Sequence, residues 1–126
     1  MLAFCPTCWN EITNSPSFCR KCGVGIDVGS VEYERQLVSL VPYSNATKRA
    51  EICLLLGQRA QQSAVPHLAK LLRADPEGLV RMAALRALSE IGDPTALREI
   101  ARVAANETSP VYAVAKDTLK NLKSLR

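Results

Sequence analysis

Four cysteines near the N-terminus are the residues whose types and spacing best fit a chemical site. Segments 5–8 and 19–22 read Cys-Pro-Thr-Cys and Cys-Arg-Lys-Cys, with ten residues between them. Each pair can form a tight turn with both sulfurs on one side, and two such turns supply the thiolates of a tetrahedral structural zinc site. Protein would fill every position, so no open position is left for catalysis. We therefore expect one structural Zn²⁺, held by Cys5, Cys8, Cys19 and Cys22.

Three other roles of these cysteines stay open on the sequence alone. Disulfides are one, although cytosolic thiols are kept reduced. A redox-active pair is another, but it would need a thioredoxin-like strand and helix around it. Four cysteines can also ligate an iron–sulfur cluster. The first residues, Met-Leu-Ala-Phe-Cys-Pro, contain neither a basic nor an apolar stretch, so we expect no signal peptide and a cytoplasmic location.

Residues 1–23 resemble a short zinc ribbon of the double-zinc-ribbon type. The resemblance is carried by Cys-Pro-x-Cys at 5–8 and by Phe-Cys-x-x-Cys-Gly at 18–23. It implies a small module that metal binding holds folded, because so short a segment cannot bury a core. Trp9 stands where that family commonly has Gly, and Gly23 lies where such a turn often needs a positive φ. We expect Trp9 and Phe18 to form the small core, with a contact for a partner as the alternative role of Trp9.

The larger part of the chain must be built from stacked helices. Between Val80 and Ile91 apolar residues recur with a period of 3.6, and further apolar residues widen the stripe, so this helix is packed on more than one side. Segment 49–57 aligns with 81–89 and segment 111–115 with 80–84, a repeat of about 32 residues. With shorter helical signals at 64–72 and 95–103, and a first helix after Ser30, the pattern predicts an all-α solenoid of three helix pairs. Cap residues mark the expected helix ends: Ser30, Asn45, Ser63 and Asp93 or Pro94 at helix starts, and Gly92, in the left-handed conformation, at a helix end.

The pattern V-R-x-x-A-x-x-A-L-x-x-I-G-D at 80–93, preceded by A-V-P-x-L at 64–68, resembles the HEAT-like repeats. The likeness is closest to the short type found in phycobilin-lyase-like proteins, and it covers roughly residues 31–126. It implies a binding surface and only rarely catalysis. The expected organisation is a zinc ribbon over 1–23, a linker over 24–30 and a HEAT-like repeat domain over 31–126.

Two arginines occupy equivalent repeat positions, at 49 and 81. One interpretation is structural, with each arginine pairing an acid or carbonyl at a neighbouring turn, such as Asp75 or Glu77. The other is a row on the inner layer that grips an acidic peptide or phosphate. Arg86 and Lys116 would extend such a row. The candidate partner-binding residues are therefore Arg49, Arg81, Arg86, Lys116 and Trp9.

No residue of the chain stands in a recognisable catalytic motif. His67, the one histidine, has no potential metal ligand or nucleophile near it in sequence, and Cys53 lies in an apolar helical stripe. There is no Gly-rich loop for phosphate and no apolar run of about 20 residues. We expect no enzymatic activity, no small-molecule substrate and no membrane span.

The predicted function is a protein–protein interaction or scaffold module. The alternative is a nucleic-acid-binding adaptor that uses the ribbon and a basic face of the repeats. The formal net charge is only +4, without the concentrated basic stripe typical of nucleic-acid binding. A third reading, by resemblance alone, is an enzyme subunit like the bilin lyases.

Overall fold

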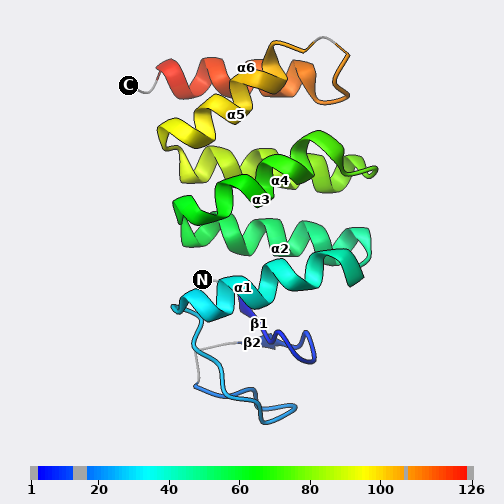
Figure 1. The fold of residues 1–126 in the computed structure, drawn as a ribbon, viewed down its shortest axis with the longest axis vertical. Coiled ribbons are helices and arrows are strands. Elements are labelled where there is room, and N and C mark those ends of the chain that lie inside the picture. The colour runs from blue at the N-terminus through cyan, green and yellow to red at the C-terminus, as the bar shows by residue number, and fades with distance from the viewer. Residues whose placement is uncertain (1–2, 13–16, 107, 125–126) are drawn as a thin grey trace. The chain divides into compact units, whose positions relative to one another are not determined.

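The computed structural model describes residues 3–12, 17–106 and 108–124 (Figure 1). Contacts within the chain divide it after Ser44, into a unit of residues 1–44 and a unit of residues 45–126. The first helix thus belongs by its contacts to the unit that carries the cysteines. The expected division into 1–23, 24–30 and 31–126 stays a prediction about the domains.

The first unit contains a short hairpin and one helix. Strand β1 (Ala3–Phe4) pairs antiparallel with β2 (Glu11–Ile12), with Ala3 opposite Ile12. Helix α1 (Val31–Leu40) follows. A 3₁₀ turn that contains Pro42, η1 (Val41–Tyr43), comes directly after it. Ser30 caps α1 as expected, because its hydroxyl accepts from Tyr33 N–H at 3.1 Å.

Tyr33 connects α1 to the hairpin. Its side chain is buried, with 3% of the residue exposed. The hydroxyl accepts a hydrogen bond from Phe4 N–H at 3.1 Å and donates one to Phe4 C=O at 2.7 Å. These two bonds join residues 29 positions apart and hold the helix against strand β1.

The second unit is wholly helical among its described residues. Helices α2, α4 and α6 pack along one another in one layer, and α3 and α5 pack together in a second layer against them. The elements are α2 (Ala46–Arg59), the 3₁₀ turn η2 (Gln62–Ala64), α3 (Val65–Ala74), α4 (Gly78–Ile91), α5 (Pro94–Ala104) and α6 (Tyr112–Ser124). The predicted all-α class and the solenoid of helix pairs are confirmed.

Helix α4 is the centre of this unit. It packs against α2, α3 and α5, and most of its apolar residues are buried, although Leu79 is exposed. Val80, Ala84, Ala87 and Leu88 have no exposed surface. Gly92 ends the helix with φ 63°, the left-handed cap that the sequence predicts.

Helix starts follow the predicted caps in part. Asn45 and Asp93 each accept from the backbone of the first turn, at 2.9 and 2.8 Å. Helix α3 begins at Val65, two residues after the expected Ser63, because η2 takes up that stretch. None of the described helices is both long and apolar enough to cross a membrane.

Candidate metal centre

The two Cys-x-x-Cys turns share one backbone pattern. In each, the N–H of the residue after the second cysteine donates to the carbonyl of the first cysteine at 2.8 Å, from Trp9 to Cys5 and from Gly23 to Cys19. Each first cysteine then donates its own N–H to the residue five positions on, at 2.9 and 2.8 Å. This folding turns both sulfurs of each pair to the same side.

The residues that close these turns have positive φ, 60° for Trp9 and 82° for Gly23. Glycine adopts this region freely, as expected for Gly23, whereas the β-carbon of a tryptophan is strained there. The Trp9 ring lies parallel to Phe4, with centroids 5.0 Å apart and planes 7° apart. The stacking offsets part of the strain, because such aromatic pairs contribute about 0.5–1.5 kcal/mol.

Phe18 differs from the expectation for the small core. It is 51% exposed, while Ile12 and Ile26 are buried. Phe18 forms an isolated backbone bridge with Gly25, and its side chain does not join the buried core. The buried apolar residues of this unit include Ile12, Ile26, Tyr33 and Leu37, and Phe4 and Trp9 stack on each other.

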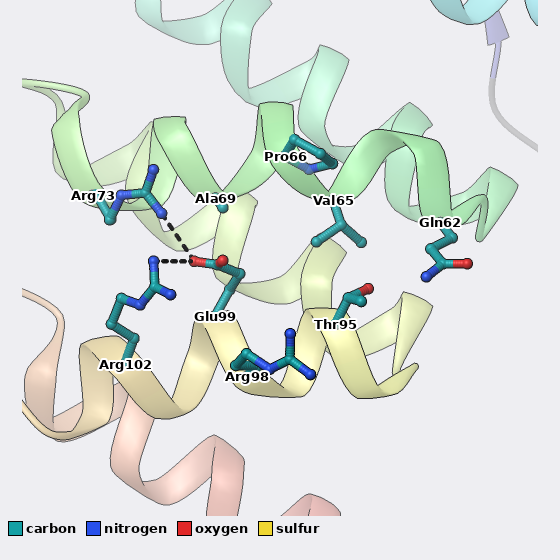
Figure 2. A pocket seen from close by; sticks show the side chains of 9 residues that line it. All are labelled: Gln62, Val65, Pro66, Ala69, Arg73, Thr95, Arg98, Glu99 and Arg102. Carbon is teal, nitrogen blue, oxygen red and sulfur yellow. Dashed lines mark hydrogen bonds and ion pairs between the residues drawn. The ribbon is translucent and has the colours of Figure 1, made fainter.

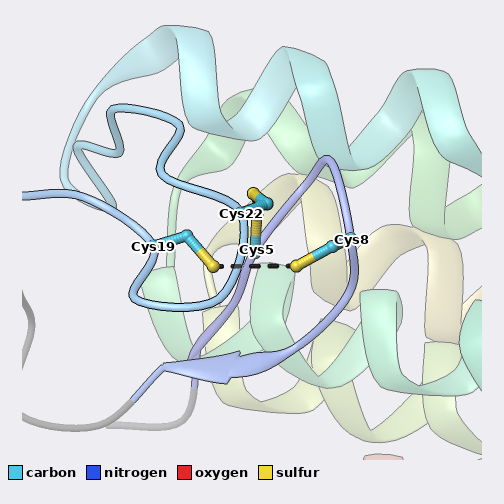
Figure 3. A group of neighbouring side chains, drawn as sticks. All are labelled: Cys5, Cys8, Cys19 and Cys22. Carbon is cyan, nitrogen blue, oxygen red and sulfur yellow. Dashed lines mark hydrogen bonds between the residues drawn. The ribbon is translucent and has the colours of Figure 1, made fainter.

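All four cysteines of the turns come together (Figure 3). Their Sγ atoms lie within 4.8 Å of one another, and the pairs Cys5–Cys22 and Cys8–Cys19 are 3.6 Å apart. A tetrahedral ion with Zn–S bonds of about 2.3 Å needs sulfurs about 3.8 Å apart. All five cysteines of the chain are free thiols. The four sulfurs could hold a metal ion, and their spacing is compatible with zinc.

Electrostatics at the centre also favours a bound cation. The N–H of Cys22 lowers the pKa of the Cys19 thiol to about 6. For Cys22 the N–H of Val24 lowers the pKa, but desolvation and the neighbouring thiols outweigh it and raise the pKa to about 11. Thiolates this close oppose each other's ionisation, and a divalent ion among them removes that conflict.

Arg49 and Arg81 converge on the turn between α3 and α4. Arg49 grips the Asp75 carboxylate with two bonds, Nε to Oδ2 at 2.8 Å and Nη2 to Oδ1 at 3.1 Å. Arg81 Nη1 donates to the Asp75 carbonyl at 2.6 Å. The Asp75 side chain is only 4% exposed, and its hydrogen bonds raise the pKa of Arg49. Both arginines donate hydrogen bonds to Asp75, which is the kind of pairing that the structural interpretation of the two residues expects.

The other candidate partner-binding residues are on α4, on α6 and in the first unit. Arg86 is exposed on α4. Lys116 is exposed on α6, with its Nζ 5.5 Å from the Tyr112 ring centroid and 3.4 Å from the Tyr112 hydroxyl. Trp9 is half-buried in the first unit. Their role in binding a partner stays a prediction.

A groove between α3 and α5 is a feature that sequence reasoning missed. It has a volume of about 390 Å³ and is lined by residues of both helices (Figure 2). Arg49 and Arg81 lie in the other layer, on α2 and α4. Its lining residues are Gln62, Val65, Pro66, Ala69, Arg73, Thr95, Arg98, Glu99 and Arg102. The signal in the sequence was the charge of these two helices, which carry four lysines and arginines against one carboxylate.

Comparison with known proteins bears on the repeats. A family model described as HEAT repeats matches residues 35–120, more than half of the chain. No curated protein and no solved structure gave a significant match. The matched range runs from within α1 to within α6, over the helix pairs described above. On this match and this helical architecture, the chain belongs to the HEAT-repeat family.

Proposed function

We propose that this chain is a non-catalytic protein-interaction module, in which a ribbon stabilised by one Zn²⁺ accompanies HEAT repeats that present the binding surface. The observation that carries the proposal is the closed set of four sulfurs within 4.8 Å. A tetrahedral ion held by Cys5, Cys8, Cys19 and Cys22 has no free position for a substrate, so its role is to hold the turns folded.

A single ion fits the sulfur positions better than an iron–sulfur cluster does. In an iron–sulfur cluster the four cysteines are distributed over two or four iron atoms. Their sulfurs therefore lie farther apart than the four sulfurs around a single ion. Here two pairs of sulfurs are 3.6 Å apart. Elemental analysis of the metal-replete protein should give one zinc per chain. Iron accompanied by visible absorbance, or no metal at all, would contradict this part of the proposal.

The interaction role is tested by capture from native extract with the zinc-loaded chain as bait. The expected result is a protein that, once purified, binds the chain saturably and survives nuclease treatment of the extract. The matched control is the double variant Cys5→Ser and Cys8→Ser, which removes the metal and leaves the repeats. Retained material that consists only of nucleic acid would instead support the alternative function, a nucleic-acid-binding adaptor.

A further inference from the structure

We propose that the groove between α3 and α5 binds an extended acidic peptide segment of a partner protein. The inference rests on the proposed interaction function and names the surface and the chemistry of the partner. It puts the binding site in the layer formed by α3 and α5, and not on α2 and α4, where one of the two interpretations of the sequence puts a row of arginines.

The groove already holds one carboxylate in the manner that a ligand would need. Glu99 Oε2 is 2.9 Å from Arg73 Nη1, on the facing helix, and 3.6 Å from Arg102 Nη1 (Figure 2). The Glu99 side chain is 18% exposed, whereas those of Arg73 and Arg102 are 44% and 59% exposed. Each guanidinium carries five N–H donors, so the contact with Glu99 uses only part of its donor capacity.

Arg98 adds a third guanidinium, one helical turn before Arg102 on the same face of α5. It is exposed, and no hydrogen bond or ion pair joins its side chain to another described residue. The lining therefore holds three arginines against one glutamate. This excess attracts an anionic ligand, and guanidinium groups bind carboxylates in two-pronged fashion.

The length of the surface points to an extended chain instead of a single anion. A second hollow of about 400 Å³, beside the connection from α5 to α6, shares Arg73 and Arg102 with the groove. The two hollows thus adjoin at these arginines. In the other direction Val65 and Thr95 face each other, and Gln62 lies beyond them (Figure 2). Acidic side chains spaced along a peptide can reach the arginines in turn.

The lining favours a peptide over a nucleic-acid strand. Pro66 is exposed and gives one wall an apolar contact for the aliphatic parts of a peptide, whereas Val65 and Ala69 line the groove but are nearly buried. No aromatic side chain lines the groove, so unpaired bases would find no stacking platform there.

The test uses the full zinc-loaded chain and two fluorescein-labelled decapeptides, one alternating Glu and Ala and the other alternating Gln and Ala. Fluorescence anisotropy should show saturable binding of the Glu peptide and at least tenfold weaker binding of the Gln peptide. Arg98→Ala and Arg102→Ala should each weaken binding about 2- to 5-fold. Glu99→Gln should strengthen binding, because it removes the competing carboxylate.

Arg86→Ala is the matched control, since it removes one exposed charge from α4, outside the lining of the groove. Circular dichroism melts check that every variant folds. The inference is overturned if Arg86→Ala weakens binding as much as Arg98→Ala, or if labelled (dT)₁₀ binds more tightly than the Glu peptide. A captured partner that binds the Arg98→Ala, Arg102→Ala double variant undiminished overturns this site and leaves the interaction function standing. Absence of any saturable protein partner would remove the function itself.

Discussion

The backbone of α2 at Gly57 passes Ala87 of α4 so closely that a β-carbon on Gly57 would lie 2.8 Å from Ala87 Cα and 2.9 Å from its Cβ. Real β-carbons do not approach other atoms so closely. The neighbour is backbone, which cannot swing aside as a flexible side chain can. The small residues that the sequence places on α4 are therefore matched by a glycine on α2.

Gly57→Ala should destabilise the repeats. Alanine is intrinsically better in a helix by about 1 kcal/mol, but overpacking costs about 1–3 kcal/mol and separates α2 from α4. Urea unfolding measures the difference. Gly78→Ala is the control, because its β-carbon would meet only Arg81 Nη2, at 3.5 Å. We expect Gly78→Ala to be neutral or stabilising, and an equal loss at both glycines would contradict the close approach.

Asp75→Ala should be among the costly polar substitutions. It leaves the Arg49 guanidinium, whose side chain is 17% exposed, without its carboxylate. Removing one partner of a largely buried pair costs about 3 kcal/mol or more. Arg86→Ala, on an exposed position, should leave the melting temperature unchanged. If Asp75→Ala melts like the wild type, the pair with Arg49 carries no stability.

Trp9 offers a test in which two effects have opposite sign. Trp9→Gly relieves the strain of φ 60° but loses the stacking on Phe4, whereas Trp9→Ala loses the stacking and keeps the strain. Zinc affinity, measured by competition with a chelator, reports the folding of this unit. We expect the order wild type, Trp9→Gly, Trp9→Ala, with about 1 kcal/mol between the two variants. The reverse order of the variants would show that this φ is not strained.

Stability should depend on pH through Asp93, the N-cap of α5. The N–H of Ala96 and the Thr95 hydroxyl donate to its carboxylate and lower its pKa below the usual value of about 3.9. A lowered pKa gives stability that is fully present above the unfolded-state pKa and is lost as pH falls through the folded-state pKa. The advantage of wild type over Asp93→Asn should therefore be present at pH 6 and shrink toward pH 3. Melting temperatures that differ equally at both pH values would show that charge at this cap is irrelevant.

Local signals in the sequence predicted the features that local chemistry determines. The cap residues Asn45 and Asp93, the left-handed Gly92 and the two cysteine turns each depend on neighbours a few positions away. Asp75 was named as one possible partner of the arginines. The sequence could not decide between pairing and exposure, because Arg49 and Asp75 are 26 positions apart.

The features that escaped prediction depend on contacts between distant segments. Tyr33 reads as one more apolar residue on a helical face, and its bonds to Phe4 require the hairpin to be in place. The groove arises only when α3 and α5 lie side by side and bring Arg73 next to Glu99. Exposed charges on single helices do not show which of them will share a hollow.

The Tyr33 hydroxyl also covers backbone groups on an open edge of the small sheet. A strand has a second side with unpaired N–H and C=O groups that invite a strand from another molecule. Phe4 presents such groups on β1, and the phenol occupies both of them. Through Tyr33, helix α1 therefore blocks the addition of another strand to this edge of the two-stranded sheet. Tyr33→Phe would leave the N–H and C=O of Phe4 open to a strand from another molecule, without changing any of the four cysteines.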